Sequence, residues 1–524
     1  MRKRHGVAAL AAALVGALLL PMGASAAEGN QWTSAGGNRQ NTRHQASEHK
    51  LGTDTVGDLA VKWVFETGGD VSATPSVDGD TVYFPDWAGS LFAVDKKTGV
   101  ERWSVSIPAI TGIPGDKARA TPAVTEDKVI VGTQGPFGGG GLVLAFDKFT
   151  GEHLWTTVAD DHPAAIITQS ATVFDGTVYV GVASLEEAFA AGGIIQGYPC
   201  CSFRGSMLAL DEDTGQILWK TYTAPEGFSG NALWGSSPAI DTKRGQVYLA
   251  TGNNYSVPQA VLDCVTLAGE DPAAKAACSP ADNLFDTVLA LDMKTGAIRW
   301  ATKALPFDAW TVDCLPFIGD GDNCPEPAGP DYDFGQAPAL FTVKDGRGKK
   351  TELVGAGQKS GQYWALNPDT GQIVWTTQAG PGGVAGGLQW GSAVDGQRVY
   401  TANANSDLTE WTLPGGGTPT TDGVWTGIDA RTGEVLWQVA PSEGGSTSGP
   451  VTTANGVVYG CSLDAQGHMY ALNAATGAEL WKFASGGSCL SGAAISNGML
   501  FWGSGYTNFG GTPSTSLYAF GLPG

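Results

Sequence analysis

The chain has 524 residues, of which 76 are glycine and 17 are tryptophan, and only 15% are charged. This composition is typical of a turn-rich β protein, and a ring of small repeated sheets can reach this length as one unit. The formal net charge of -21 argues against a nucleic-acid ligand and against an anionic membrane surface, because both repel an acidic protein.

Residues 1–26 have the pattern of a secretory signal peptide. A basic start over residues 1–5 precedes an apolar stretch over residues 7–20, and Ala24-Ser25-Ala26 suits cleavage. No later stretch is long and apolar enough to span a membrane. We therefore expect a soluble protein that is secreted or periplasmic, with residues 27–54 as an N-terminal lead-in segment and residues 55–524 as the folded body.

An eleven-residue phrase recurs seven times along the chain. It reads A-x-(D/N)-x-x-T-G-x-x-x-W, and only Gly427 departs from the leading alanine. The spacing inside the phrase is constant, whereas successive tryptophans are 44 to 81 residues apart. The copies end at Trp103, Trp155, Trp219, Trp300, Trp375, Trp437 and Trp481. A fixed unit with variable inserts predicts a repeat fold that carries loops.

A second element precedes each phrase: a short apolar strand, a tight turn and another strand. The first example runs from Thr74 to Phe84 and alternates apolar and polar residues. Similar elements begin near Thr121, Ser170, Ser236, Gln336, Gly391, Gly449 and Gly492, which makes eight. Each hairpin and the phrase after it supply four antiparallel strands, A to D, with the tryptophan on strand D. The sequence therefore predicts an all-β, eight-bladed β-propeller whose tryptophans dock one blade on the next.

The eighth repeat lacks its own tryptophan strand. Its strand C is Ser516 to Phe520, and Leu59 to Trp63 near the N-terminus has the form of the missing strand D. We expect these two segments to pair and to close the ring, which removes the open sheet edge. Because successive strands alternate in direction, the long B–C and D–A loops lie on one face, and we expect the functional site there.

Export and an even number of cysteines favour disulfides, and eight cysteines are present. Sequence proximity suggests the pairs Cys264–Cys278, Cys314–Cys324 and Cys461–Cys489. The adjacent Cys200 and Cys201 then form a strained ring, remain thiols or pair elsewhere, because neighbouring Cα atoms are only about 3.8 Å apart. The sequence contains no Cys-x-x-Cys-His segment, and its six histidines lack metal-ligand spacing, so neither a c-type haem nor a zinc site is expected.

Chemically useful residues stand at the ends of three predicted B strands. Glu186 and Glu187 follow strand B of blade three, Asn253 follows that of blade four, and Lys359 follows that of blade five. Such strand ends converge near a propeller axis. Because carboxylate and amide oxygens suit a hard cation, the pattern indicates a Ca²⁺ site beside a lysine.

These residues resemble those of the pyrroloquinoline quinone-dependent alcohol dehydrogenases, which are eight-bladed quinoprotein propellers. The tryptophan phrase matches over almost all of residues 55–524, and the segments 234–241 (WGSSPAID) and 248–253 (YLATGN) are more specific. The resemblance implies that Trp234 stacks under the quinone ring and that Asn253 binds Ca²⁺.

The same resemblance assigns further residues. Glu186 would be the second Ca²⁺ ligand, with Glu187 as the alternative, and Lys359 would contact the quinone carbonyls. Cys200 and Cys201 would form a vicinal disulfide against the other quinone face. Arg204 and Asn403 would be additional cofactor contacts.

The sequence offers two candidates for the catalytic base. In the family an aspartate directly follows a tryptophan, but Thr311 follows Trp310 here. Asp313 and Asp308 are therefore the two candidates, and Asp313 is favoured because the Cys314–Cys324 loop would hold it.

The resemblance, which is nearest to the polyvinyl alcohol dehydrogenase branch, implies an exported enzyme. It would oxidise an alcohol, a secondary alcohol or polyvinyl alcohol among them, by hydride transfer to pyrroloquinoline quinone. Electrons would pass to an external acceptor such as a cytochrome. The alternative is a non-catalytic propeller scaffold of the cell envelope, but the combined glutamate, asparagine, lysine and adjacent cysteines favour the enzyme.

Overall fold

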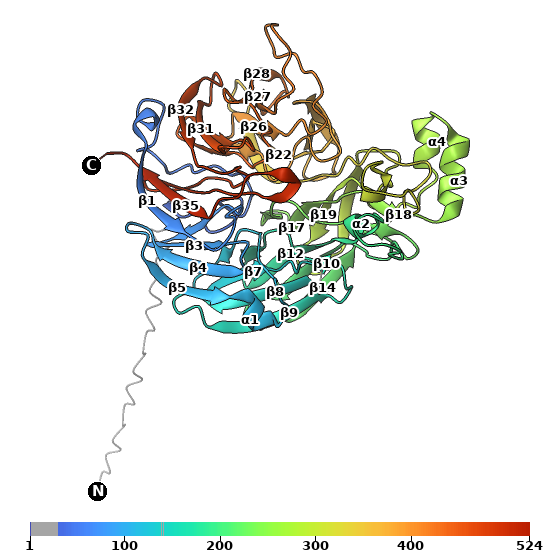
Figure 1. The fold of residues 1–524 in the computed structure, drawn as a ribbon, viewed down its shortest axis with the longest axis horizontal. Helices are drawn as coiled ribbons and strands as arrows, with labels where there is room; N and C mark the ends of the chain where they lie inside the picture. Colours follow the sequence, from blue (N-terminus) through green and yellow to red (C-terminus); the bar gives the residue numbers. More distant parts are fainter. Residues whose placement is uncertain (2–29, 138, 140, 524) are drawn as a thin grey trace.

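The computed structural model of the protein is a ring of small sheets (Figure 1). It describes residue 1 and residues 30–523, except residues 138 and 140. The predicted signal peptide, residues 1–26, thus lies outside the described residues apart from Met1. Eight antiparallel sheets, each built on four strands, follow one another around the ring, which confirms the predicted propeller.

Each blade runs from an inner strand A to an outer strand D. Blade one contains β2 (Ser76–Asp78), β3 (Thr81–Pro85), β4 (Ser90–Asp95) and β5 (Glu101–Ser106), and blade two contains β6 (Ala123–Val124), β7 (Lys128–Gly132), β8 (Gly141–Asp147) and β9 (His153–Asp160). Blade three contains β11 (Thr172–Phe174), β12 (Thr177–Ser184), β13 (Ser206–Asp211) and β14 (Ile217–Tyr222), and blade four contains β16 (Ala239–Asp241), β17 (Gln246–Ala250), β19 (Thr287–Asp292) and β20 (Ile298–Lys303). Blade five contains β21 (Ala339–Lys344), β22 (Lys350–Gly357), β23 (Gln362–Leu366) and β24 (Ile373–Gln378), and blade six contains β25 (Ala393–Val394), β26 (Arg398–Asn403), β27 (Val424–Asp429) and β28 (Val435–Val439). Blade seven contains β29 (Thr452–Ala454), β30 (Val457–Cys461), β31 (His468–Asn473) and β32 (Glu479–Ala484).

The eighth blade joins the two ends of the chain. It contains β33 (Ala494–Ser496), β34 (Met499–Gly503), β35 (Ser516–Gly521) and, as its outer strand, β1 (Ala60–Glu66). β1 pairs antiparallel with β35, and Trp63 lies opposite Ala519. The predicted closure of the ring by the N- and C-terminal strands is therefore confirmed.

The recurrent tryptophans join neighbouring blades in the same way. Six of the seven recurrent indoles, and that of Trp63, donate to a backbone carbonyl of the next blade at 3.0–3.1 Å, in the pairs Trp63–Lys96, Trp103–Lys148, Trp155–Glu212, Trp219–Met293, Trp300–Pro368, Trp437–Ala474 and Trp481–Leu59. The indole N–H of Trp375 has no hydrogen-bond partner among the described residues. The ring of Trp300 also covers Gly371 of the next Thr-Gly turn, where φ is +72° and a Cβ would lie 2.6 Å from the indole. This turn therefore needs glycine for its conformation and for the close contact.

We expect Trp300→Ala to lower the free energy of unfolding by about 3–5 kcal/mol, because the side chain is only 9% exposed and its removal leaves a cavity between two blades. Denaturant unfolding measures the change. Leu154→Ala on the outer strand β9, where the side chain is 43% exposed, should change the free energy by less than about 0.5 kcal/mol. Equal effects of the two substitutions would contradict the docking role.

The lead-in segment lies along the inner strands of the ring. Six inner-strand amides donate to lead-in carbonyls at 2.7–2.9 Å, in the pairs Val77–Trp32, Val124–Thr33, Ile240–Arg39, Leu340–Gln40, Val394–Thr42 and Thr453–Arg43. The guanidinium of Arg43 is buried and donates to Val451 O at 2.8 Å. The lead-in segment is thus part of the ring structure rather than a linker.

The long inserts lie on the B–C and D–A loops, as the alternation of strands predicts. They contain β10 (Ala165–Ile166), β15 (Ser229–Gly230), β18 (Asn254–Ser256), α1 (Ile107–Thr111), α2 (Glu186–Phe189), α3 (Gln259–Ala268), α4 (Pro272–Ala276), η3 (Val312–Cys314) and η4 (Asn508–Gly510), while η2 (Val56–Asp58) precedes β1. α3 and α4 project at the right of Figure 1. All four disulfides, including the vicinal pair Cys200–Cys201, are formed.

Candidate active site

Asp333 joins three of the predicted site residues. Its Oδ1 accepts the backbone amide of Asn253 at 2.6 Å, and its Oδ2 accepts the indole N–H of Trp234 at 3.0 Å. Lys359 Nζ lies 3.2 Å from Asp333 Oδ2, 2.9 Å from Asp331 Oδ1 and 5.6 Å from the centre of the Trp234 ring. The ends of β17 and β22 therefore bring Asn253 and Lys359 together, and two aspartates from the loop between β20 and β21 hold them.

The two adjacent glutamates at the start of α2 face different surroundings. Glu186 is fully buried, and its carboxylate accepts the backbone amides of Ser202 at 2.8 Å and Phe203 at 2.7 Å, and the hydroxyl of Tyr198 at 3.2 Å. Oε1 of Glu187 is buried without a hydrogen-bond donor among the described residues. Burial raises the pKa of Glu187 against the opposing effect of Lys359. Glu187 therefore faces the lysine, whereas Glu186 holds the segment after the vicinal disulfide.

Two further buried carboxylates complete an acidic cluster. Asp286 is paired with the carboxylate of Asp308, and burial together with the neighbouring aspartates raises its pKa well above the usual value, so that it is the protonated partner of the two. Asp308 accepts the amides of Asp331 at 3.1 Å and Tyr332 at 2.8 Å, yet burial raises the pKa of Asp308 to about 6. We call Glu187, Asp286, Asp308, Asp331 and Asp333 the acidic cluster.

The acidic cluster has the chemistry of a cation site. Lys359 pairs directly with two of its members. Burial lowers the pKa of Lys359, but Asp331 and Asp333 raise it further, so that Lys359 stays protonated. Asn253 Nδ2 donates to Trp310 O at 2.9 Å, which leaves Oδ1 available to a cation. Within the described ranges, no group of three or more His, Cys, Asp or Glu side chains is placed so that it could hold a metal ion by itself. The unpaired Oε1 of Glu187 and the amide oxygen of Asn253 nevertheless have the chemistry of hard-cation ligands, because a buried carboxylate oxygen requires a partner.

Asp313, the favoured base, lies in a different environment. Its carboxylate accepts the backbone amides of Asn323 at 2.7 Å, Asp320 at 3.0 Å and Gly192 at 3.3 Å. Burial acts to raise the pKa of Asp313, but these hydrogen bonds outweigh it and lower the pKa. Asp313 thus fastens two inserts to each other, and Asp308 is the candidate base that the structure brings to the acidic cluster.

The other predicted cofactor contacts are spread over more than one blade and do not all lie at the acidic cluster. Cys201 packs with Trp234 on one apolar cluster of blades two and three. Arg204 donates from Nε to Ala224 O at 2.8 Å and lies 4.3 Å from the centre of the Tyr222 ring. Asn403 at the end of β26 is buried and donates from Nδ2 to Pro381 O at 2.8 Å. Neither Arg204 nor Asn403 bonds directly to the acidic cluster.

Sequence reasoning missed several residues next to Trp234. Trp390 packs edge-on against Trp234, with ring centres 5.1 Å apart, and the Arg119 guanidinium lies 5.0 Å from the Trp390 ring centre. Arg119 forms no ion pair with an acidic side chain in the part of the chain that the structure describes. The repeated Trp-Gly-Ser segments at Trp234 and Trp390 were a usable signal for the second tryptophan, whereas Arg119 had none.

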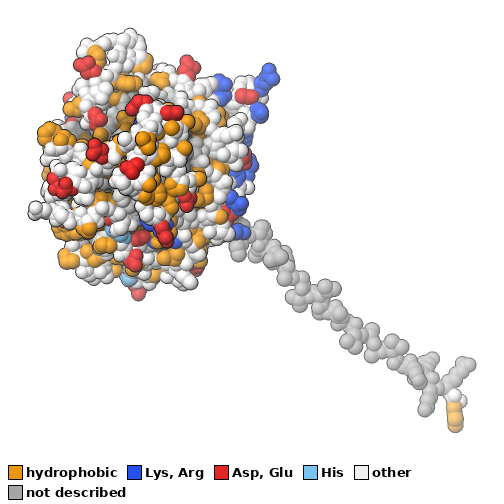
Figure 2. All heavy atoms as spheres, turned by 90° about the vertical axis from the view of Figure 1, so that its right-hand side faces the viewer, with side chains coloured by type: hydrophobic (Ala, Val, Ile, Leu, Met, Phe, Trp, Pro, Cys, Tyr) orange, Lys and Arg blue, Asp and Glu red, His pale blue; other side chains and the backbone are white. Residues whose placement is uncertain are grey.

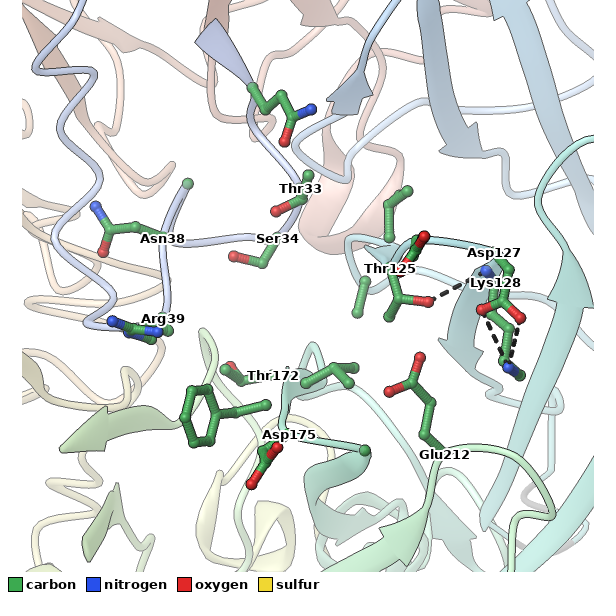
Figure 3. A pocket seen from close by; sticks show the side chains of 18 of the residues that line it. Thr33, Ser34, Asn38, Arg39, Thr125, Asp127, Lys128, Thr172, Asp175 and Glu212 are labelled. Carbon is green, nitrogen blue, oxygen red and sulfur yellow. Dashed lines mark hydrogen bonds and ion pairs between the residues drawn. The ribbon is translucent and has the colours of Figure 1, made fainter. Parts of the chain in front are cut away.

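A further cavity lies away from these residues (Figure 3). It has a volume of about 910 Å³ and lies between the lead-in segment and the turns of blades two and three, among Asn38, Arg39, Asp175 and others. Lys128 at its edge pairs with Asp127 at 2.9 Å and with Asp213 at 2.8 Å. No predicted site residue lines this cavity, so size alone does not identify the active site here.

We expect Glu186→Gln to loosen the segment after the vicinal disulfide, because an amide replaces the carboxylate that accepts the Ser202 and Phe203 amides. The free energy of unfolding should fall by about 1–3 kcal/mol, and hydrogen exchange at these two amides should accelerate. The exposed Glu226→Gln is the matched control and should change stability by less than about 0.5 kcal/mol. Exchange at the wild-type rate in Glu186→Gln would refute this role.

Comparisons with known proteins identify the family of the chain. A family model described as "Outer membrane protein assembly factor BamB" matches residues 31–302 and 421–508. The polyvinylalcohol dehydrogenase of Sphingopyxis sp. (strain 113P3) is 31% identical, over 94% of this chain and 77% of that protein. A polyvinylalcohol dehydrogenase of a Pseudomonas sp. is 30% identical, over 91% of this chain and 73% of its own length. The crystal structure of quinohemoprotein alcohol dehydrogenase from Comamonas testosteroni has a TM-score of 0.69 at 18% identity, over 96% of this chain and 82% of that one, and shows the shared fold.

The fold is that of a quinoprotein-like propeller. The chain belongs to the family of pyrroloquinoline quinone-dependent alcohol dehydrogenases, which confirms the resemblance seen in the sequence. Membership in this family implies the quinone and a metal ion as cofactors. Within the described part of the chain, none of the helices combines the length and the apolar composition needed to cross a bilayer.

Proposed function

We propose that this protein oxidises secondary alcohols, polyvinyl alcohol among them, by hydride transfer to pyrroloquinoline quinone, with Ca²⁺ as the metal ion. We further propose that it is exported and passes electrons to an external acceptor such as a cytochrome. The observation that carries the proposal is the placement of Lys359 and Trp234 against an acidic cluster that contains an unpaired buried carboxylate oxygen. The names of the two relatives at 30% and 31% identity support the substrate class.

The residues present fit both cofactors. Glu187 and Asn253 would hold the metal ion, since each offers an oxygen that accepts no hydrogen bond from the described side chains. Trp234, fixed by its bond to Asp333, offers a flat apolar ring beside Lys359. When bound, the quinone accepts the hydride and the cation acts as a Lewis acid.

The chain itself supplies the base and the positive charges. Asp308 accepts the hydroxyl proton of the alcohol at a carboxylate oxygen, and its raised pKa of about 6 leaves it ionised at neutral pH but more basic than an ordinary aspartate. Lys359 remains protonated between Asp331 and Asp333 and stabilises negative charge that develops beside it. Arg119, which has no acidic partner, is placed to pair with a carboxylate of the cofactor.

The alternative of a non-catalytic scaffold draws support from the description of the matching family model. A scaffold, however, gives no reason to bury Oε1 of Glu187 without a hydrogen-bond donor among the described residues, because such burial destabilises the fold.

Substrate comparison tests the proposed activity. Purified protein with the quinone and Ca²⁺ should reduce a dye with polyvinyl alcohol and with 2,4-pentanediol faster than with ethanol. Preference for ethanol would contradict the substrate class, and an absence of activity with all three would contradict the enzyme assignment.

A further inference from the structure

Two inserts on the site face pack against each other. The first, residues 188–201, begins in the second half of α2, and the second, residues 314–324, is closed by the Cys314–Cys324 disulfide. The amide of Gly193 donates to Ile318 O at 3.1 Å, and Asn323 Nδ2 donates to Ala190 O at 2.8 Å. The inserts therefore form one surface with a fixed backbone.

Large apolar side chains stand exposed on this surface. Phe317 is 98% exposed, Ile194 is 49% exposed and Ile318 is 42% exposed. We call these three residues the apolar rim. Covering such side chains is favourable in water, and grouped exposed apolar residues are typical of binding surfaces.

The apolar rim is continuous with the active site. The first insert begins directly after Glu187 and ends at the vicinal disulfide. The segment leading to the second insert begins at Trp310, whose carbonyl accepts the side chain of Asn253. Both inserts that carry the apolar rim are therefore joined directly to segments of the active site.

The charge of the inserts indicates what binds there. Residues 188–201 and 314–319 contain no charged side chain, whereas the remainder of the second insert carries the exposed Asp320 and Asp322. Figure 2, which faces the side that carries α2, α3 and α4, shows apolar side chains among scattered acidic ones. The three side chains of the apolar rim carry no charge themselves, and an uncharged carbon chain needs none.

We propose that the apolar rim binds the uncharged carbon backbone of a polymeric alcohol and holds the polymer while one carbinol enters the active site. This inference rests on the proposed function, and it makes Phe317, Ile194 and Ile318 specificity-determining residues for polymers. On this proposal a small alcohol, which lacks a long carbon chain, binds without the rim.

The test uses the double variant Phe317→Ser/Ile194→Ser in the complete chain. Its KM for polyvinyl alcohol should rise about tenfold, which corresponds to about 1.4 kcal/mol, while kcat and the kinetics with 2,4-pentanediol should not change. Phe149→Ser is the matched control, because Phe149 is 70% exposed but lies in the turn between β8 and β9, on the opposite face. This control should leave both substrates unaffected.

A binding measurement separates this inference from the proposed function. Native gels cast with polyvinyl alcohol should retard the wild-type protein, with or without the quinone, and should retard the double variant less. Retardation without any alcohol oxidation would overturn the proposed function and leave the rim as a polymer site. Equal retardation of both proteins, or an equal loss of activity on polymer and small alcohol, would overturn the inference. So would a variant that is slowed only with a protein electron acceptor, because the rim would then be a docking surface for that partner.

Discussion

Glu187→Gln is expected to reduce quinone-dependent alcohol oxidation at least about 100-fold at fixed Ca²⁺, because it removes a charged oxygen from the proposed metal site. The same change should leave the stability of the metal-free protein equal or higher, since Oε1 of Glu187 is buried without a donor among the described residues. Dye-linked activity and thermal unfolding, each with and without Ca²⁺, measure the two effects.

The neighbouring glutamate provides the contrast. Glu186→Gln should destabilise the metal-free protein, whereas Glu187→Gln should not, although the two residues are adjacent in sequence. If Glu187→Gln keeps the wild-type response to Ca²⁺ and Glu186→Gln loses it, the assignment of the two glutamates must be exchanged.

Asp308→Asn is expected to lower kcat by about 10²- to 10⁴-fold, because the variant lacks the group that accepts the alcohol proton. In the wild-type enzyme the base works only when ionised. Burial raises the pKa of Asp308 to about 6, so kcat/KM should fall as the pH drops below about 6 and should level off above it. Steady-state kinetics between about pH 4.5 and 8, a range that brackets the pKa of Asp308, measure this acid limb of the pH profile.

Asp313→Asn is the matched control for the base. Because the Asp313 carboxylate accepts three backbone amides, the substitution should reduce stability but retain the acid limb of the pH profile. A loss of the acid limb in Asp313→Asn, with normal turnover in Asp308→Asn, would show that Asp313 is the base.

The repeat phrase was sufficient to predict the ring. Its tryptophans and Thr-Gly turns make the same packing contacts in successive blades. The residues that define the phrase are therefore also the residues that pack one blade against the next. The closure by β1 followed from the missing tryptophan strand in the eighth repeat. The lead-in segment was not predictable, because it bonds to the inner strands through backbone carbonyls, which place no demand on side-chain type.

The sequence predicted those active-site residues that follow a regular strand. Asn253 and Lys359 follow β17 and β22, and the structure brings both to Asp333. The choice between Glu186 and Glu187 depends on the first turn of α2, where strand alternation no longer applies. Asp331 and Asp333 lie in a loop without a repeat pattern, and only the tertiary course of that loop brings them to the lysine.

The central claim is that the acidic cluster and Lys359 form a site for pyrroloquinoline quinone that depends on a metal ion. Equilibrium titration of the purified protein with the quinone, followed by tryptophan fluorescence in Ca²⁺ and in chelator, tests it most directly. We predict saturable binding of one quinone per chain in Ca²⁺, and binding at least about tenfold weaker in chelator. An absence of saturable binding in Ca²⁺, or binding unaffected by the chelator, would contradict the account.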